Sequence, residues 1–229
     1  MLRGERERLK GFIGAGFEND VRRKTEKFHF RGGDEVKEII FFGRGGQGAV
    51  IASQVLAKAA FSEGKYAHAF PMFGSERKGS PVQAYARLSD EAIETREPII
   101  QADYVIVLDP AIFRTFNPLS FLKSGGSSVI NTARSEKEIK VRFEHPEHVR
   151  VFTLDATAIA TAIYGHSSIP RTNIAVLGAF VAATSEVKMK SIDHALEGFF
   201  SGDLLRKAKK SGRMSYAEIS KRKGQSTRS

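Results

Sequence analysis

Short apolar runs alternate along this chain with longer stretches in which apolar residues recur every three or four positions. The run at residues 37–43, KEIIFFG, is apolar at successive positions and ends in glycine, which predicts a buried strand of a parallel sheet. Residues 47–64 carry apolar or small side chains at helical spacing and end in Gly64, which predicts an amphipathic helix. The first predicted unit is therefore a strand, a glycine-rich loop and a helix.

The same alternation continues through the rest of the chain. Residues 65–73 predict a second strand, and residues 80–88 alternate apolar and polar side chains, which is the pattern of a half-buried strand. Further strands are predicted at residues 102–110, 125–132 and 149–156, and further helices at residues 156–164, 173–186 and 191–200. This order predicts an α/β fold: an open doubly wound, mostly parallel sheet with helices on both faces.

The two ends of the chain differ from this body in charge and pattern. Residues 1–38 show no sustained apolar period and are interpreted as an N-terminal arm of charge +2. Residues 206–229 hold nine Lys and Arg against Glu218, a charge of +8, and are interpreted as a solvated, frayed basic tail. The total charge is +10, so the predicted domain, residues 39–205, is neutral. Because a nucleic-acid-binding domain carries its basic patch on the fold itself, this distribution argues against a nucleic-acid partner.

Composition narrows the class of protein further. A length of 229 residues fits one α/β domain, and no apolar run is long enough to span a bilayer. The first residues are charged and lack the apolar core of a secretory signal, so we expect a cytoplasmic protein without a membrane partner. There is no cysteine, which excludes disulfides and cysteine-ligated clusters in this chain, and the six histidines show no metal-ligand spacing; HPEH at residues 145–148 is interpreted as a surface loop. We therefore expect no metal bound by this chain.

The glycine-rich loop is the first candidate for chemistry. Gly43, Gly45 and Gly48 satisfy G-x-G-x-x-G between a predicted strand and helix, where main-chain N–H groups attract phosphate. A dinucleotide site also needs an acidic residue at the end of the next strand, but residues 71–73 are Pro-Met-Phe. Glycines could serve tight packing alone, yet Arg44 and Gln47 are not needed for a turn and can pair with phosphate or carbonyl oxygens.

Three sequence blocks carry a resemblance to a known family. They are FFGRGGQGAVIASQVLAKAA, KYAHAFPMFGSERKGSPVQAYARLSD and RTNIAVLGAF, with DYVIVLDP between the second and the third. In this order they closely resemble the gamma subunit of the 2-oxoacid:ferredoxin oxidoreductases, whose best-known member is pyruvate:ferredoxin oxidoreductase, or pyruvate synthase. The resemblance covers residues 39–200 and leaves both ends of the chain outside it.

The resemblance implies a role within a larger enzyme. Such complexes oxidatively decarboxylate a 2-oxoacid, here expected to be pyruvate, to acyl-coenzyme A and carbon dioxide while reducing ferredoxin. The implied partners are alpha, beta and delta (ferredoxin-like) subunits. Thiamine diphosphate, Mg²⁺ and [4Fe-4S] clusters would lie in these partners, and the gamma chain would help bind coenzyme A and close the thiamine site. Catalytic residues are then expected in the assembly and none in this chain alone.

The resemblance also implies which residues contact coenzyme A. They are Gly43, Arg44, Gly45, Gly46, Gln47 and Gly48 in the glycine loop, Ser75, Glu76, Arg77, Lys78 and Gly79 in the polar loop, and Asn173 at a predicted helix start. Arg77 is the first choice for a phosphate contact. Asn173 could equally satisfy backbone groups at its helix start, and Asp109, before Pro110, is interpreted as a structural turn former.

Two other functions stay open at this point. A free-standing NAD(P)-binding oxidoreductase domain could use Arg77 or Lys78 for a 2′-phosphate. An RNA-binding or scaffold protein could act through the basic tail, in which case removal of residues 206–229 would abolish binding.

Overall fold

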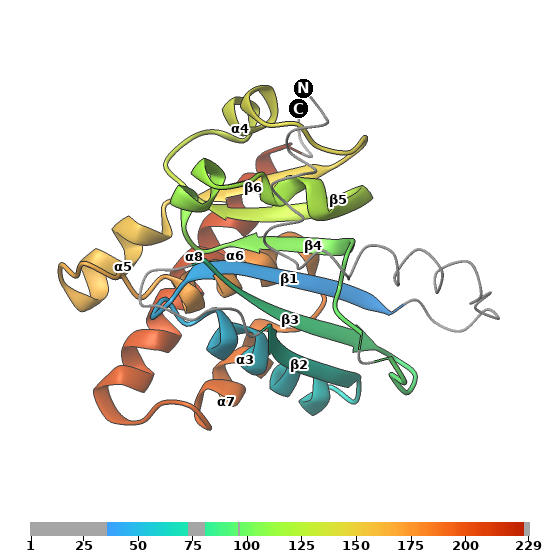
Figure 1. The fold of residues 1–229 in the computed structure, drawn as a ribbon. Helices are drawn as coiled ribbons and strands as arrows, with labels where there is room; N and C mark the ends of the chain where they lie inside the picture. The colour runs from blue at the N-terminus through green and yellow to red at the C-terminus, as the bar shows by residue number, and fades with distance from the viewer. Residues whose placement is uncertain (1–35, 73–80, 96, 227–229) are drawn as a thin grey trace. The chain divides into compact units, whose positions relative to one another are not determined.

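A computed structural model of the chain describes residues 36–72, 81–95 and 97–226, all of which belong to the compact unit Glu35–Ser229 (Figure 1). The predicted arm, residues 1–38, lies outside the described residues except for its last three. The centre of the unit is a six-stranded sheet with the strand order β2-β3-β1-β4-β5-β6.

Most of the sheet is parallel. β1 (Lys37–Arg44), β4 (Ala102–Val107), β5 (Leu122–Asn131) and β6 (Arg150–Leu154) run in one direction. β3 (Pro81–Ser89) is antiparallel to β1, and β2 (Tyr66–Met72) is antiparallel to β3 at the edge of the sheet. The predicted fold class is confirmed, but β1 has a parallel neighbour on only one side, because β3 lies between β1 and β2 and is antiparallel to both.

Helices cover both faces of this sheet, in unequal numbers (Figure 1). One face, called the helix face below, packs against α3 (Ala49–Ser62), α5 (Ala156–Tyr164), α6 (Asn173–Thr184), α7 (Met189–Leu196) and α8 (Gly202–Ser226). The other, called the aromatic face, packs against α4 (Glu136–Arg142) and the short 3₁₀ helices η1 (Pro110–Arg114) and η2 (Pro118–Phe121). Six phenylalanines contribute to the core on the aromatic face: Phe42, Phe70, Phe113, Phe116, Phe121 and Phe143.

The prediction that residues 80–88 form a half-buried strand is wrong in one respect, because β3 is buried on both faces. The polar side chains that should face solvent, Gln83, Tyr85 and Arg87, are only 7%, 3% and 2% exposed. They are satisfied internally: the Tyr85 hydroxyl donates to Gln83 Oε1 at 2.8 Å, and Arg87 pairs with Glu38 at 3.0 Å and lies over the Phe70 ring. Alternation alone cannot distinguish this arrangement from a solvated face.

The interpretation of residues 206–229 as a frayed tail is also wrong for the described part, because α8 is a 25-residue helix packed against α6. Its buried residues are small or apolar and recur at helical spacing: Ala208, Ser211, Gly212, Ser215 and Ile219. A methyl group at Gly178 of α6 would lie 2.1 Å from the Gly212 carbonyl oxygen, so the two backbones touch. The eight basic residues of α8 concealed this narrow stripe in the sequence. Across the described ranges, no helix combines the length and apolar character that crossing a membrane requires.

A candidate ligand-binding edge of the sheet

Four elements bring candidate residues to the carboxyl edge of the parallel strands. β1 ends at Arg44, the residues after β4 are Leu108 and Asp109, and α3 and α6 both begin here. The antiparallel pair reaches the same edge, since Pro81 lies opposite Arg44, and Met72 lies opposite Gln83. In open α/β sheets this edge is where ligands bind.

The glycine loop is shaped by two positive φ angles and by one close approach. Gly46 and Gly48 have φ of 93° and 82°, in the region that glycine adopts freely. A Cβ atom at Gly48 would lie 2.5 Å from Asn173 Nδ2, which donates to the Gly48 carbonyl oxygen at 3.3 Å. Asn173 therefore bonds a backbone group at the start of α3, not one of its own helix, and links the first turns of α3 and α6.

Asp109 holds the polar side chains of the loop together. Its Oδ2 accepts from Arg44 Nε at 2.7 Å and from Gln47 Nε2 at 2.6 Å, while its Oδ1 accepts from the Ala111 N–H at 2.8 Å and so caps η1. The side chain is buried. Its interpretation as a turn former is confirmed by the cap, but sequence reasoning missed its larger role, the anchoring of Arg44.

Arg44 and Gln47, predicted together as ligand contacts, differ in what they can still do. Both polar atoms of the buried Gln47 amide are used, since Oε1 accepts from the Arg44 N–H at 2.8 Å and Nε2 donates to Asp109. Arg44 uses Nε on Asp109, and its side chain stays 44% exposed. Within the described residues its terminal nitrogens have no hydrogen-bond partner. We therefore assign Gln47 to positioning Arg44, whose outer guanidinium edge remains available.

Two further side chains fix the end of β4. The Leu108 carbonyl oxygen accepts from Asn131 Nδ2 at 2.8 Å and from Thr172 Oγ1 at 3.3 Å. Asn131 ends β5 and Thr172 precedes α6, so both tie neighbouring elements to the loop that carries Asp109. Sequence reasoning did not single them out; their one signal was a polar residue at the carboxyl end of a predicted strand and before a predicted helix.

The second predicted wall, Ser75, Glu76, Arg77, Lys78 and Gly79, lies outside the described residues. The described residues that flank this loop, Met72 and Pro81, lie at the carboxyl edge of the parallel strands. In the part of the chain that the structure describes, no group of three histidine, aspartate or glutamate side chains could hold a metal ion. His145 and His148 are exposed in a loop, as the sequence predicted.

Comparison with known proteins identifies the family. The family model described as pyruvate ferredoxin/flavodoxin oxidoreductase matches residues 38–218. A pyruvate/ketoisovalerate oxidoreductases common subunit gamma from Thermococcus litoralis is 42% identical over 179 residues, which are 78% of this chain and 95% of that protein. The pyruvate synthase subunit PorC of Methanocaldococcus jannaschii is 41% identical over 187 residues, 82% of this chain and 99% of its own.

Solved structures agree with this result. The pyruvate oxidoreductase subunit PORC of Thermotoga maritima superposes with a TM-score of 0.67 at 31% identity, covering 80% of this chain and 96% of its own. The 2-oxoglutarate:ferredoxin oxidoreductase of Magnetococcus marinus, solved with 2-oxoglutarate, coenzyme A and succinyl-CoA bound, has a TM-score of 0.65 at 18% identity; it covers 83% of this chain and 32% of that one, and shows the fold alone. The chain therefore belongs to the pyruvate ferredoxin/flavodoxin oxidoreductase family, as one of its gamma subunits.

Proposed function

We propose that this chain works in a complex that oxidatively decarboxylates a 2-oxoacid to acyl-coenzyme A and carbon dioxide and passes the electrons to ferredoxin. Pyruvate is the first substrate to test, because the relatives whose names include pyruvate align with this chain over nearly their whole length. Alpha, beta and delta subunits would be its partners. The chain has no cysteine, so [4Fe-4S] clusters would be carried by those partners, as would thiamine diphosphate and Mg²⁺.

The contribution that we propose for this chain is to bind coenzyme A at the carboxyl edge and to close the thiamine site against its partners. The observation that carries the proposal is Arg44, held on Asp109 at 2.7 Å in a loop whose glycines carry no side chain. Coenzyme A presents a pyrophosphate and a 3′-phosphate, which guanidinium and main-chain N–H groups recognise. Asp109 would repel these phosphates if it were unpaired, and its ion pair with Arg44 balances that charge.

The residues present fit this ligand better than a dinucleotide. β2, the next strand along the chain, ends at Met72, so no carboxylate closes it to bind a ribose diol. Coenzyme A does not need that carboxylate, because its ribose carries the 3′-phosphate. Arg77 remains the predicted first contact for a phosphate, and Gly43, Gly45, Gly46 and Gly48 would let the backbone approach the pyrophosphate. An NAD(P) site is not favoured.

The test is a reconstituted complex assayed for reduction of a viologen dye by pyruvate and coenzyme A. Replacing Arg44 by alanine, and in a second variant Arg77 by alanine, is expected to raise the KM for coenzyme A about tenfold each, with a smaller effect on the KM for pyruvate. Arg206→Ala is the matched control, because Arg206 is exposed and pairs with Asp203 on α8.

Two results would contradict the proposal. One is an unchanged KM for coenzyme A in both variants while the complex assembles normally. The other is a chain that purifies from its native cells alone and without activity; NADP binding would then be measured on it directly.

A further inference from the structure

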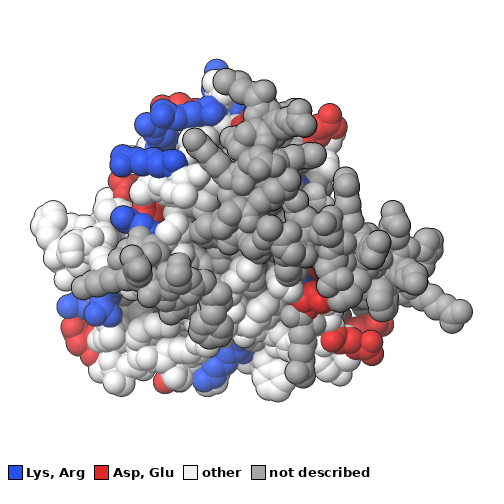
Figure 2. All heavy atoms as spheres, viewed as in Figure 1, with Lys and Arg blue, Asp and Glu red and all other residues white. Residues whose placement is uncertain are grey.

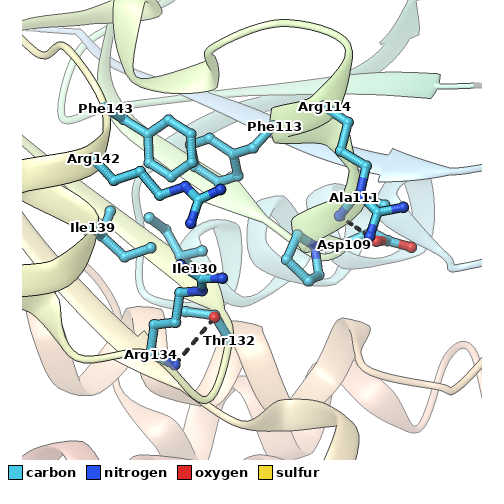
Figure 3. Close-up of a pocket in the computed structure, with 11 residues that line it drawn as sticks. Asp109, Ala111, Phe113, Arg114, Ile130, Thr132, Arg134, Ile139, Arg142 and Phe143 are labelled. Carbon is cyan, nitrogen blue, oxygen red and sulfur yellow. Dashed lines mark hydrogen bonds between the residues drawn. The ribbon is translucent and has the colours of Figure 1, made fainter.

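A pocket of about 500 Å³ lies between η1 and α4, with Asp109 in its lining (Figure 3). Ile130 and Ile139 form an apolar part of its wall, and Asp109 and Thr132 lie at the carboxyl ends of β4 and β5. The pocket therefore shares the ligand-binding edge of the sheet but is lined by residues of the aromatic face. The residues proposed above to hold coenzyme A, except for Asp109 as their anchor, are not part of its lining.

Three arginines give this pocket a positive charge. Figure 3 shows Arg134 and Arg142 extending from the α4 side, with Arg114 of η1 opposite them. No salt bridge within the described residues joins any of the three guanidinium groups to a carboxylate. The pKa of the solvent-exposed Glu138 is lowered mainly by its hydrogen bonds from Ser135, and Arg134 adds only a small effect in the same direction. The single acid in the lining, Asp109, is already paired with Arg44. An excess of positive charge therefore remains beside an apolar floor.

The rest of the lining suits a ligand with a flat or apolar portion. The Phe113 and Phe143 rings pack with their centroids 4.2 Å apart, and the Arg142 guanidinium lies over the Phe143 ring at 5.8 Å. Both rings are half-buried, so part of each remains accessible. Guanidinium groups recognise phosphate through paired N–H donors, whereas rings and branched aliphatic side chains contact a base or another apolar group.

We infer that this pocket is a second anion site, which binds the phosphates of a nucleotide through Arg114, Arg134 and Arg142 and its apolar part against the phenylalanines. The inference stands apart from the function proposed above, since the glycine loop does not contribute to it. The phosphates could belong to a separate nucleotide or to the nucleotide end of a coenzyme A molecule, and the experiment distinguishes these two sources.

The experiment is calorimetric titration of the full chain, at low and at high salt, with ADP, inorganic pyrophosphate, adenosine and coenzyme A as probes. We expect ADP to bind more tightly than pyrophosphate, and adenosine to bind most weakly. The affinity for ADP should fall as the salt concentration is raised. The double variant Arg134→Gln/Arg142→Gln should lose affinity for ADP about tenfold or more. The double variant Arg134→Lys/Arg142→Lys should lose less affinity for ADP, because it keeps the positive charges and lacks only the paired N–H donors.

Arg206→Gln is the control for total charge, because Arg206 is exposed on α8, and it should not change the affinity for ADP. If saturating coenzyme A prevents ADP binding and loses affinity in the same double variant, the pocket takes the nucleotide end of coenzyme A. If both bind together, the nucleotide is a separate ligand. The inference is overturned if the double variant binds ADP as the unmodified chain does, or if the unmodified chain shows no ADP binding up to about 10 mM. The coenzyme A test on Arg44 in the complex would be unaffected by that failure.

Discussion

The two faces of the sheet are packed on different principles. On the helix face, the backbones of α6 and α8 touch, and five of the eleven buried α6 residues are alanine or glycine. On the aromatic face, large rings meet at ordinary distances, with centroids of Phe42 and Phe116 5.2 Å apart, and of Phe116 and Phe121 6.1 Å apart. The first arrangement tolerates no added atom at its closest point, whereas the second leaves room for buried polar groups and for a pocket.

The comparison suggests that stability and binding are divided between the faces. Close contact between helix backbones fixes α6, and therefore the position of Asn173 at the carboxyl edge. The aromatic face contains the three arginines of the pocket and the buried Tyr85 and Arg87. If this division is correct, substitutions on the helix face should act mainly through stability, and substitutions at the edge should act through both stability and binding.

The largest effect is expected from Gly178→Ala on the helix face. Its new methyl group would lie 2.1 Å from a backbone oxygen of α8, which cannot move without displacing the helix. We expect a loss of about 3 kcal/mol or more in the free energy of unfolding, or no folded protein. Thermal and urea unfolding followed by circular dichroism would measure it.

The matched control is Gly224→Ala, also a helical glycine, with nothing within 4 Å of the position of its Cβ. It should be neutral or stabilise the chain by up to about 1 kcal/mol, because alanine favours the helix. Equal behaviour of the two variants would mean that the α6–α8 contact is not as close as described.

A somewhat smaller effect is expected from Gly48→Ala at the carboxyl edge. The substitution combines an unfavourable φ of 82° with a Cβ position 2.5 Å from Asn173 Nδ2, and should cost about 2–3 kcal/mol. Gly64→Ala has a similar φ of 89° with nothing within 4 Å of its Cβ position, so it measures the backbone contribution alone, about 1 kcal/mol.

Removing the Asn173 side chain tests whether Gly48→Ala loses more stability than its control variant because of a steric clash. The double variant Gly48→Ala/Asn173→Ala should be more stable than the sum of the single effects predicts, since the new methyl group then has space. If the two single effects simply add, the loss of stability in Gly48→Ala comes from the backbone alone, and Asn173 does not clash with the new methyl group.

Much of this fold could be predicted from the sequence because its strongest signals are local. The apolar runs at β1 and β4 and the helix at residues 156–164 follow from hydrophobic pattern and from turn residues. The packing of α8 could not be predicted in the same way. Its buried stripe is made mostly of Ala, Ser and Gly, which carry little hydrophobic signal. Its close packing depends on Gly178, which faces Gly212 and lies 34 residues earlier in the chain.

At the candidate site, the residues could be found in the sequence but not their relations. The pattern of the glycine loop singled out Arg44 and Gln47 together, and only the structure shows that Gln47 is used inside the protein. Asp109 is 65 positions from Arg44, so no local pattern connects them. The arginine pocket draws its three cations from η1, the β5–α4 connection and α4, each of which appears in the sequence as an ordinary solvated charge.

Asp109→Asn tests the link between the edge and the aromatic face, because Asp109 contacts the glycine loop and also caps η1. The amide keeps the size of the side chain and an acceptor for Ala111, but it loses the ion pair with Arg44. Since Arg44 is 44% exposed and screened by water, we expect only about 1–2 kcal/mol in stability. The KM for coenzyme A in the complex should rise severalfold, because Arg44 is no longer held in place. A normal KM together with lowered stability would show that the anchor serves the fold alone.

The smallest effect is expected from alkaline pH, and it compares the two faces directly. Burial raises the pKa of Tyr85, on the aromatic face, from 10.0 to about 12, against an opposing influence of Arg87. The folded protein therefore holds this proton more tightly than the unfolded chain. The stabilisation is complete below pH 10 and is lost as pH rises toward 12, by about 1.4 kcal/mol at pH 11. Unfolding by urea from pH 9 to 11.5 should show this slope, and Tyr85→Phe should reduce it.

Tyr104 is the counterpart on the helix face, where it packs on Phe180. Burial raises its pKa as well, and its hydrogen bond to Glu186 acts in the same direction. Tyr104→Phe should therefore also reduce the alkaline slope, and the double variant should reduce it by the sum of both effects, because the two rings lie in separate cores. If the double variant keeps the full pH dependence, groups outside both cores cause the alkaline loss of stability. If its reduction of the slope is smaller than the two single reductions added together, the two tyrosines do not contribute independently.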